Sequence, residues 1–95
     1  MKELQCIYDS RNSFYGKAKV IQEERNNLII NNLYSYNILV ARRITNVDTM
    51  KTTYEYLGKY SQTTTRHQKE FFKQNGLSDT QIKELFKNGK LEAIL

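Results

Sequence analysis

Side chains that could bind an anion are most concentrated in the stretch Tyr60–His67, which contains one serine, three threonines and an arginine. The surrounding pattern predicts a change from strand to helix here, so these hydroxyls would lie at a helix N-terminus. The first N–H groups of a helix are unpaired and carry a partial positive charge, to which Arg66 adds a full charge. The stretch therefore predicts a phosphate or carboxylate site formed by Tyr60, Thr63, Thr64, Arg66 and His67. The alternative is that the serine and threonines only cap the helix.

His67 is the single imidazole of the chain. It could act as a general acid or base only beside suitable partners, and the acidic residues are scattered, mostly next to lysine or arginine. The four glycines are isolated, so the sequence contains no glycine-rich phosphate loop. We therefore predict a protein without catalytic residues, and a small hydrolase or nuclease that uses His67 stays open as an alternative.

We expect neither a bound metal nor another cofactor. One cysteine and one histidine cannot supply the roughly four nitrogen and sulfur ligands of a structural zinc site. Cys6 lies in an apolar run and is expected to be a small core residue.

A second group of cationic and aromatic side chains is predicted on one face of a sheet. Alternation along the expected strands places five residues on the outward face: Tyr15, Lys17, Lys19, Arg43 and Lys51. Aromatic rings interleaved with cations suit single-stranded nucleic acid, because bases stack on the rings and phosphates pair with the cations. A solvated face that binds nothing is the alternative.

The first 60 residues are rich in residues that favour strands. The pattern predicts strands over Leu4–Tyr8, Phe14–Gln22, Tyr34–Thr45 and Met50–Leu57. Asn31-Asn32 is predicted as a tight turn, because asparagine tolerates a positive φ.

Two short helices are predicted after the strands. Thr65 is expected to cap the first, with Gln68 completing a capping box and Gly76 ending the helix. Ser78 and Gln81 form the equivalent pair in the second, and Gly89 ends it.

The connection between the two helices is short enough for a helix-turn-helix motif. However, Asp79 at the start of the second helix would repel DNA phosphates, so this motif is disfavoured.

Strands followed by helices indicate an α+β fold, in which two short C-terminal helices pack on a small antiparallel sheet of about four strands. We expect a single domain over residues 1–95, with a β-rich part at 1–60 and a helical part at 63–95. The apolar tail Leu91–Leu95 is expected to pack against this domain.

The composition suits a small protein with a modest core, since 39% of its 95 residues are apolar. A chain of this size can gain stability by forming a homodimer. A net charge of +5 favours a polyanionic partner such as nucleic acid, although the basic residues are spread along the chain. Because no signal peptide or apolar membrane span is apparent, the expected location is the cytoplasm.

Three short stretches carry a resemblance to a known family: Ser13–Ala18 (SFYGKA), Tyr34–Ala41 (YSYNILVA) and Tyr60–Phe71 (YSQTTTRHQKEF). In this order they resemble a family of small uncharacterised proteins found in phages and other mobile elements of low-GC bacteria. That family has no assigned activity or catalytic residues, so the resemblance implies a biological context and no site.

The context that the resemblance implies is a small protein that docks on host machinery. Together with the positive charge, it favours a non-enzymatic binding protein that modulates a host nucleoprotein complex. An anti-CRISPR-type inhibitor of a CRISPR–Cas effector in the host cell is one such protein. Its first-choice contacts would be Tyr60, Arg66, His67 and Arg43. A stand-alone nucleic-acid-binding module is the alternative.

Overall fold

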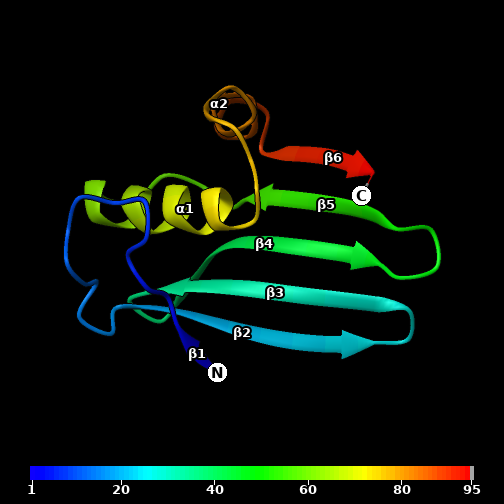
Figure 1. The fold of residues 1–95 in the computed structure, drawn as a ribbon, viewed down its shortest axis with the longest axis horizontal. Helices are drawn as coiled ribbons and strands as arrows, with labels where there is room; N and C mark the ends of the chain where they lie inside the picture. The colour runs from blue at the N-terminus through cyan, green and yellow to red at the C-terminus, as the bar shows by residue number, and fades with distance from the viewer. Residues whose placement is uncertain (95) are drawn as a thin grey trace.

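The computed structural model describes residues 1–94, which form one six-stranded antiparallel sheet and two helices (Figure 1). The helices, α1 (Gln62–Gln74) and α2 (Asp79–Asn88), follow the fifth strand in the chain. The order of the strands in the sheet is the same as their order in the chain. The strands are β1 (Lys2–Glu3), β2 (Ala18–Arg25), β3 (Leu28–Ser35), β4 (Ile38–Asn46), β5 (Lys51–Tyr56) and β6 (Lys90–Ile94).

The predicted α+β class is confirmed, but the predicted number of about four strands is too low. The turn Tyr36–Asn37 divides the single strand predicted over Tyr34–Thr45 into β3 and β4. After α2, the tail pairs with β5 as β6, so the helices do not end the chain. Of the predicted tail, Leu95 lies outside the described residues.

Asn31 and Asn32 lie inside β3, so the tight turn predicted for them is wrong. Asn32 is buried, and its Nδ2 donates to the Ile21 carbonyl at 3.4 Å and to Glu23 Oε1 at 2.9 Å. These bonds use both hydrogens of the side-chain amide, so the preference of asparagine for turns is overridden. The two-residue loop between β2 and β3 is Asn26–Asn27 instead.

The strand predicted over Leu4–Tyr8 is also wrong, since β1 ends at Glu3. The chain leaves the sheet there and runs along α1. Gln74 Nε2 donates to the Gln5 carbonyl at 2.7 Å, and the Tyr8 N–H donates to Glu70 Oε1 at 2.9 Å. Side chains of α1 thus replace a neighbouring strand as partners of this backbone.

A register shift between β3 and β4 changes which side chains share a face of the sheet. It falls between Leu33 and Tyr34 and leaves Val40 of β4 without a partner across the pair. Such a bulge interrupts the regular alternation of side chains along a strand. Arg43 consequently lies opposite Tyr54, which packs in the helix-covered core, and not on the outward face predicted for it.

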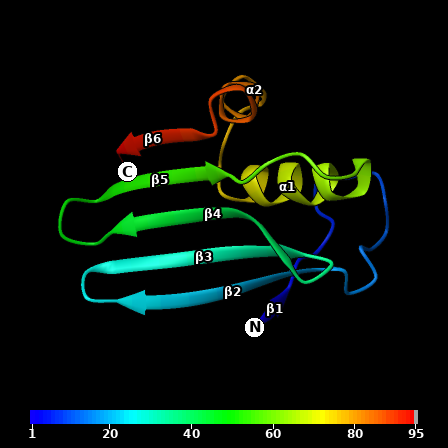
Figure 2. The same ribbon diagram turned by 180° about the vertical axis from the view of Figure 1, so that it is seen from behind.

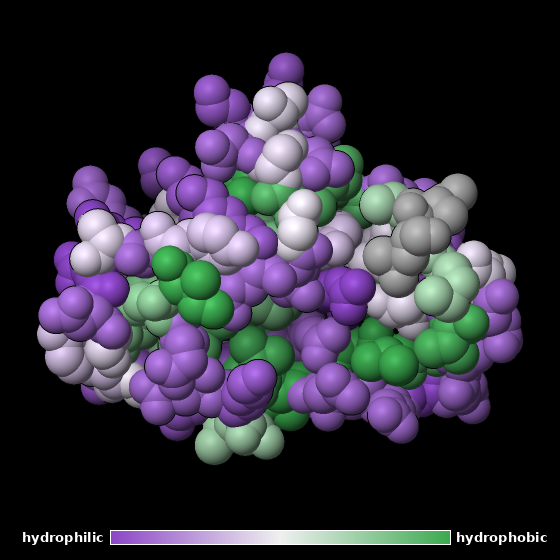
Figure 3. Space-filling model, viewed as in Figure 1, coloured by the Kyte–Doolittle hydropathy of each residue, from purple (hydrophilic) through white to green (hydrophobic). Residues whose placement is uncertain are grey.

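Both helices pack on one face of the sheet near one end of its strands (Figures 1 and 2). In both views β2 to β4 extend beyond α1. The core lies where the helices meet the sheet, and its buried residues are Leu4, Phe14, Ala18, Leu33, Val40, Ala41, Tyr54, Phe71, Phe72, Leu77, Ile82 and Leu85. On the side seen in Figure 3, hydrophobic residues reach the surface in separate places between hydrophilic ones.

The first helix begins earlier than predicted. Ser61, and not Thr65, is its N-cap, because Ser61 Oγ accepts from the Thr64 N–H at 3.1 Å. Gly76, with a φ of 91°, follows the last residues of α1 in the left-handed conformation that was predicted there.

The limits of the second helix are confirmed. Ser78 and Gln81 form the capping box, and Gly89 ends α2 with a φ of 82°. Within residues 1–94, neither α1 nor α2 is long and apolar enough to cross a membrane.

A candidate binding site around His67

The N-terminal half of α1 forms one wall of a small cavity, which we call the His67 pocket. Its volume is about 180 Å³, and it is closed by the segment before β2 and by the β3–β4 turn. Residues far apart in the sequence line it: Arg11, Ser13, Phe14, Tyr15, Lys17, Tyr36, Thr63, Arg66 and His67. All three of these chain segments lie at the same end of the sheet (Figure 1).

A chain of hydroxyl groups holds the imidazole of His67 in place. Ser35 Oγ lies 2.7 Å from His67 Nδ1 and 2.9 Å from Thr64 Oγ1. Ser61 Oγ donates to the same Thr64 oxygen at 3.3 Å. When Thr64 donates to Ser35 and Ser35 donates to Nδ1, every hydroxyl proton of this chain is used in a hydrogen bond. We accordingly assign the ring proton to Nε2.

His67 is fully buried, and its Nε2 has no hydrogen-bond partner among the described residues. The ring of Phe14 packs edge-on at a centroid distance of 4.5 Å, and that of Tyr36 lies at 5.9 Å. Buried polar atoms are normally paired, so an unpaired nitrogen on a residue that lines a cavity is a candidate hydrogen-bond partner for a ligand.

Burial lowers the pKa of His67, because the surroundings disfavour the charged imidazolium. The nearby Asp9 carboxylate acts in the opposite direction, and Arg11 lowers the pKa further. The ring is therefore neutral at physiological pH, and it offers a neutral N–H and not a cation.

The distance between Ser35 and His67 is the one expected for a catalytic nucleophile and its base, but their surroundings differ from those of such a pair. Ser35 is 1% exposed, so its oxygen does not face the solvent as the oxygen of a nucleophile does. Its hydroxyl also belongs to the chain that leads to Thr64. These contacts orient the ring, and they do not favour the hydrolase alternative that uses His67.

Three cations converge on the pocket from separate segments: Arg11, Lys17 and Arg66. Arg66 Nη1 lies 3.3 Å from Asp9 Oδ1, and that oxygen also accepts from the Arg11 N–H at 2.9 Å. Asp9 thus holds the backbone at Arg11 and the guanidinium of Arg66. Its carboxylate neutralises one of the three positive charges. Lys17 is exposed. The surplus positive charge suits an anionic ligand.

Both tyrosines of the pocket have left-handed backbone conformations, with a φ of 54° for Tyr15 and 51° for Tyr36. Each precedes another residue of positive φ, Gly16 or Asn37, as in a type I′ turn. That turn favours asparagine or glycine at both central positions, and such backbone strain clusters at functional sites. Tyr15 is 76% exposed and Tyr36 is 49% exposed, so the rings are available to a ligand.

The structure brings together only part of the predicted site. Thr63, Arg66, His67 and Lys17 line the pocket, and Thr64 supports His67 from behind. The remaining predicted residues, Tyr60, Lys19 and Arg43, do not line it.

Each of those three residues has a different environment. Tyr60 is exposed in the connection before α1. Lys19, in β2, pairs with Tyr34 of β3. Arg43 donates from Nε to the Tyr54 hydroxyl at 3.4 Å.

Sequence reasoning missed Arg11, Tyr36 and Ser35 as members or supports of this site. Tyr36 was predicted to lie within the continuous strand Tyr34–Thr45. The available signal was Asn37, since a two-residue turn that contains asparagine would have ended β3 and exposed the tyrosine.

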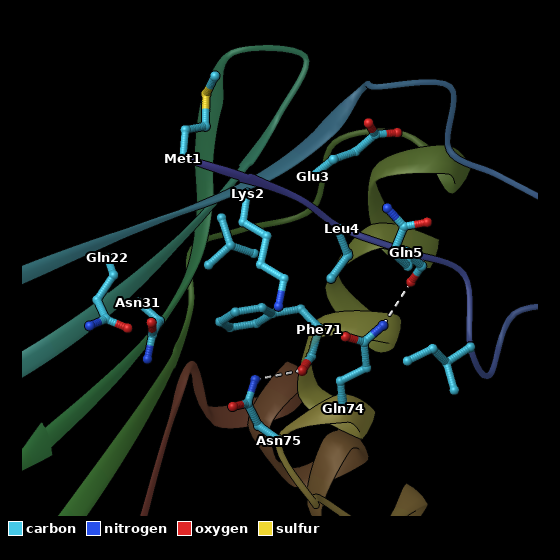
Figure 4. Close-up of a pocket in the computed structure, with 12 residues that line it drawn as sticks. Met1, Lys2, Glu3, Leu4, Gln5, Gln22, Asn31, Phe71, Gln74 and Asn75 are labelled. Carbon is cyan, nitrogen blue, oxygen red and sulfur yellow. Dashed lines mark hydrogen bonds between the residues drawn. The ribbon is translucent and has the colours of Figure 1, made fainter.

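A larger cavity of about 440 Å³ lies between the N-terminal segment, the end of α1 and the sheet (Figure 4). Met1 to Gln5 form one wall, and Gln74 and Asn75 at the end of α1 form another, with Gln22 and Asn31 contributed by the sheet. Two of its amide side chains are engaged, because Gln74 bonds to the Gln5 carbonyl at 2.7 Å and Asn75 to the Phe71 carbonyl at 2.8 Å.

Within residues 1–94, no group of three or more histidine, cysteine, aspartate or glutamate residues is arranged to hold a metal ion. Cys6 is half-buried and packs against the core, and burial raises the pKa of its thiol. Cys6 therefore lies at the edge of the core, and not inside it as predicted.

Comparisons with known proteins add a family and no activity. No curated protein and no solved structure matches the sequence. One family model matches residues 2–88, a span that includes every segment of the His67 pocket. The chain therefore belongs to a family of unknown function, DUF8033.

Proposed function

We propose that this protein is a non-enzymatic binding protein of a phage or another mobile element, and that it modulates a host nucleoprotein complex. In this proposal it acts in the manner of an anti-CRISPR-type inhibitor of a host defence system. The observation that carries the proposal is the His67 pocket, where dispersed sequence positions supply three cations and two exposed tyrosines at one end of the sheet.

The chemistry of this end of the molecule supports binding more than turnover. Its imidazole is locked by Ser35, and its cations are arranged around a cavity with a volume of only about 180 Å³. Pockets that enclose a whole small-molecule substrate usually measure about 300–1,000 Å³. A protruding group of a large partner fits such a small site better than a free substrate does.

Affinity capture from a lysate of the bacterial host, with and without nuclease treatment, tests this function. A tag after β6 is suitable, because that strand runs to the end of the sheet opposite the Tyr36–Asn37 turn (Figure 1). We expect a nucleoprotein complex among the retained proteins. Capture by a Lys17→Glu variant should be reduced, whereas the matched Lys83→Glu variant on the exposed surface of α2 should capture as well as the native protein. Retention of no nucleoprotein complex by the native protein would contradict the proposal.

A stand-alone nucleic-acid-binding module is a second candidate, favoured by the same pairing of cations with exposed aromatic rings. Titration of labelled single- and double-stranded nucleic acid at two salt concentrations separates the two. Tight, salt-sensitive binding without a partner protein, combined with capture of bare nucleic acid from the lysate, supports the module.

A further inference from the structure

The unpaired Nε2 of His67 and the two strained tyrosines together define what kind of group the pocket accepts. We infer that the His67 pocket binds one phosphate group of single-stranded nucleic acid, with the adjoining base stacked on Tyr15 or Tyr36. This inference rests on the proposed function and names the component of the host complex that the site contacts.

The donors of the pocket match the oxygens of a phosphodiester. Arg11, Lys17 and Arg66 supply charge at the mouth, and His67 supplies a neutral N–H from the wall. A phosphate has several acceptor oxygens, so it can bond to a guanidinium and to the imidazole at the same time. The carboxylates nearby are Asp9, which is bridged to Arg66, and Glu3, which accepts from the Gly16 N–H at 3.1 Å.

The size of the cavity favours a single backbone group over a whole nucleotide. A volume of about 180 Å³ accommodates one phosphate and leaves the sugar and base outside. Tyr15 and Tyr36 stand at that boundary with much of their surface exposed. An unpaired base presents its face to such rings, whereas a base inside a duplex is already stacked.

Nε2 is itself covered from solvent, so a ligand oxygen reaches it only when a side chain at the rim moves. Tyr15 and Tyr36 are the most exposed rings of the pocket. We expect one of them to rotate outward when a base stacks on it. Binding then changes the surroundings of the imidazole, which can be observed because the chain has a single histidine.

The test uses a fluorescein-labelled single-stranded oligonucleotide and the purified full chain. Fluorescence anisotropy should show binding that Lys17→Glu weakens about tenfold, with a salt slope lower by about one unit. Tyr15→Asn should weaken binding by about tenfold as well, because one base loses its stacking partner. Two controls should bind like the native protein: Lys83→Glu, which makes the same charge change, and Tyr60→Asn, which removes an exposed tyrosine outside the pocket.

Nuclear magnetic resonance of the His67 ring supplies the second readout. The oligonucleotide should shift the ring signals and raise the pKa of His67, because a bound phosphate stabilises the imidazolium. Inorganic phosphate alone, a phosphopeptide and a DNA duplex should each shift the signals less at equal concentration.

Three results would overturn the inference: no binding of the oligonucleotide, equal binding by the pocket variants, or ring shifts as large with phosphate alone, phosphopeptide or duplex. None of these results tests the proposed function, because that function is tested by capture of the host complex. If that capture persists while the oligonucleotide fails to bind, only the assignment of this pocket to nucleic acid is lost.

Discussion

Tyr15 has a backbone conformation that tyrosine rarely adopts. It holds a left-handed conformation with most of its ring in solvent, so burial of the ring offsets little of the backbone strain. Asparagine adopts this conformation more easily. Tyr15→Asn should therefore raise the free energy of unfolding by on the order of 1 kcal/mol, as measured by urea denaturation, while it weakens ligand binding.

Tyr60→Asn is the matched control for stability, since Tyr60 is an exposed tyrosine without a positive φ. Its free energy of unfolding should change by less than about 0.5 kcal/mol. A clear loss of stability in Tyr15→Asn would show instead that the ring makes favourable contacts in the free protein.

His67 makes the stability of the fold depend on pH. Burial lowers its folded-state pKa below the ordinary value of 6.5, so the unfolded chain binds the proton more readily. Stability should thus be fully present above about pH 6.5, and it should fall as the pH drops from there towards the folded-state pKa. Urea unfolding measured between about pH 7.5 and about pH 5.5 should show this decline.

A His67→Gln variant is the control for this dependence, because it lacks the titrating ring. Its stability is expected to be lower throughout, since Ser35 loses its partner, but flatter over the same interval. An unchanged slope in the variant would assign the dependence to another group.

Among the elements, α1 carries buried polar side chains that bond to other segments of the chain, and no sequence pattern indicated them. Gln68 Nε2 donates to the carbonyls of Val40 and Gly58, both at 3.0 Å. Glu70 accepts from the N–H groups of Tyr8 and Asp9 at 2.9 and 2.8 Å. The helix therefore positions the N-terminal segment and the β4 bulge as well as covering the core.

Glu70→Gln tests this role of α1. The N–H groups of Tyr8 and Asp9 both bond to Oε1, so glutamine keeps this acceptor oxygen but loses its negative charge, and bonds to a charged group are worth about 1.5–3 kcal/mol. We expect faster hydrogen exchange at the Tyr8 and Asp9 amides and a loss of stability on this order. The exposed Glu84→Gln in α2 should change neither. Unchanged exchange at Tyr8 and Asp9 in Glu70→Gln would show that the negative charge of Glu70 does not contribute to holding the segment.

The elements differ in how far the sequence determines them. The ends of α2 were predictable, because Ser78, Gln81 and Gly89 act on residues within one turn of themselves. The register of β4 on β3 was not, since the bulge at Val40 and the buried Asn32 depend on partners in other strands and in α1. The misplaced face of Arg43 follows from that bulge.

The site was predictable to the same extent. Thr63, Arg66 and His67 share one helix, so a single local pattern indicated them. Arg11 and Tyr36 reach the pocket only because the N-terminal segment crosses α1 and the β3–β4 turn ends beside it. Such contacts are fixed by topology, and local residue patterns do not encode them.

On the scale of the whole molecule, the site and the core share the helix α1. Phe72 is fully buried in the last turn of α1, with the ring of Tyr54 from the sheet and that of Phe86 from α2 each at a centroid distance of 6.3 Å. His67 and Arg66 lie one turn or more before it. Any loss of helix docking should therefore open the pocket and the core together.

Phe72→Ala measures this coupling. Loss of the buried ring should lower the free energy of unfolding by about 3–5 kcal/mol, a large share of the roughly 5–15 kcal/mol typical of a domain. We expect urea to unfold the native protein in one transition, with circular dichroism of the sheet and the His67 ring signals giving the same midpoint. In Phe72→Ala both midpoints should fall equally, whereas the exposed Val47→Ala in the β4–β5 loop should leave them within error. An earlier midpoint for the His67 signals would mean that the pocket opens before the sheet, and that its rigidity does not come from the shared core.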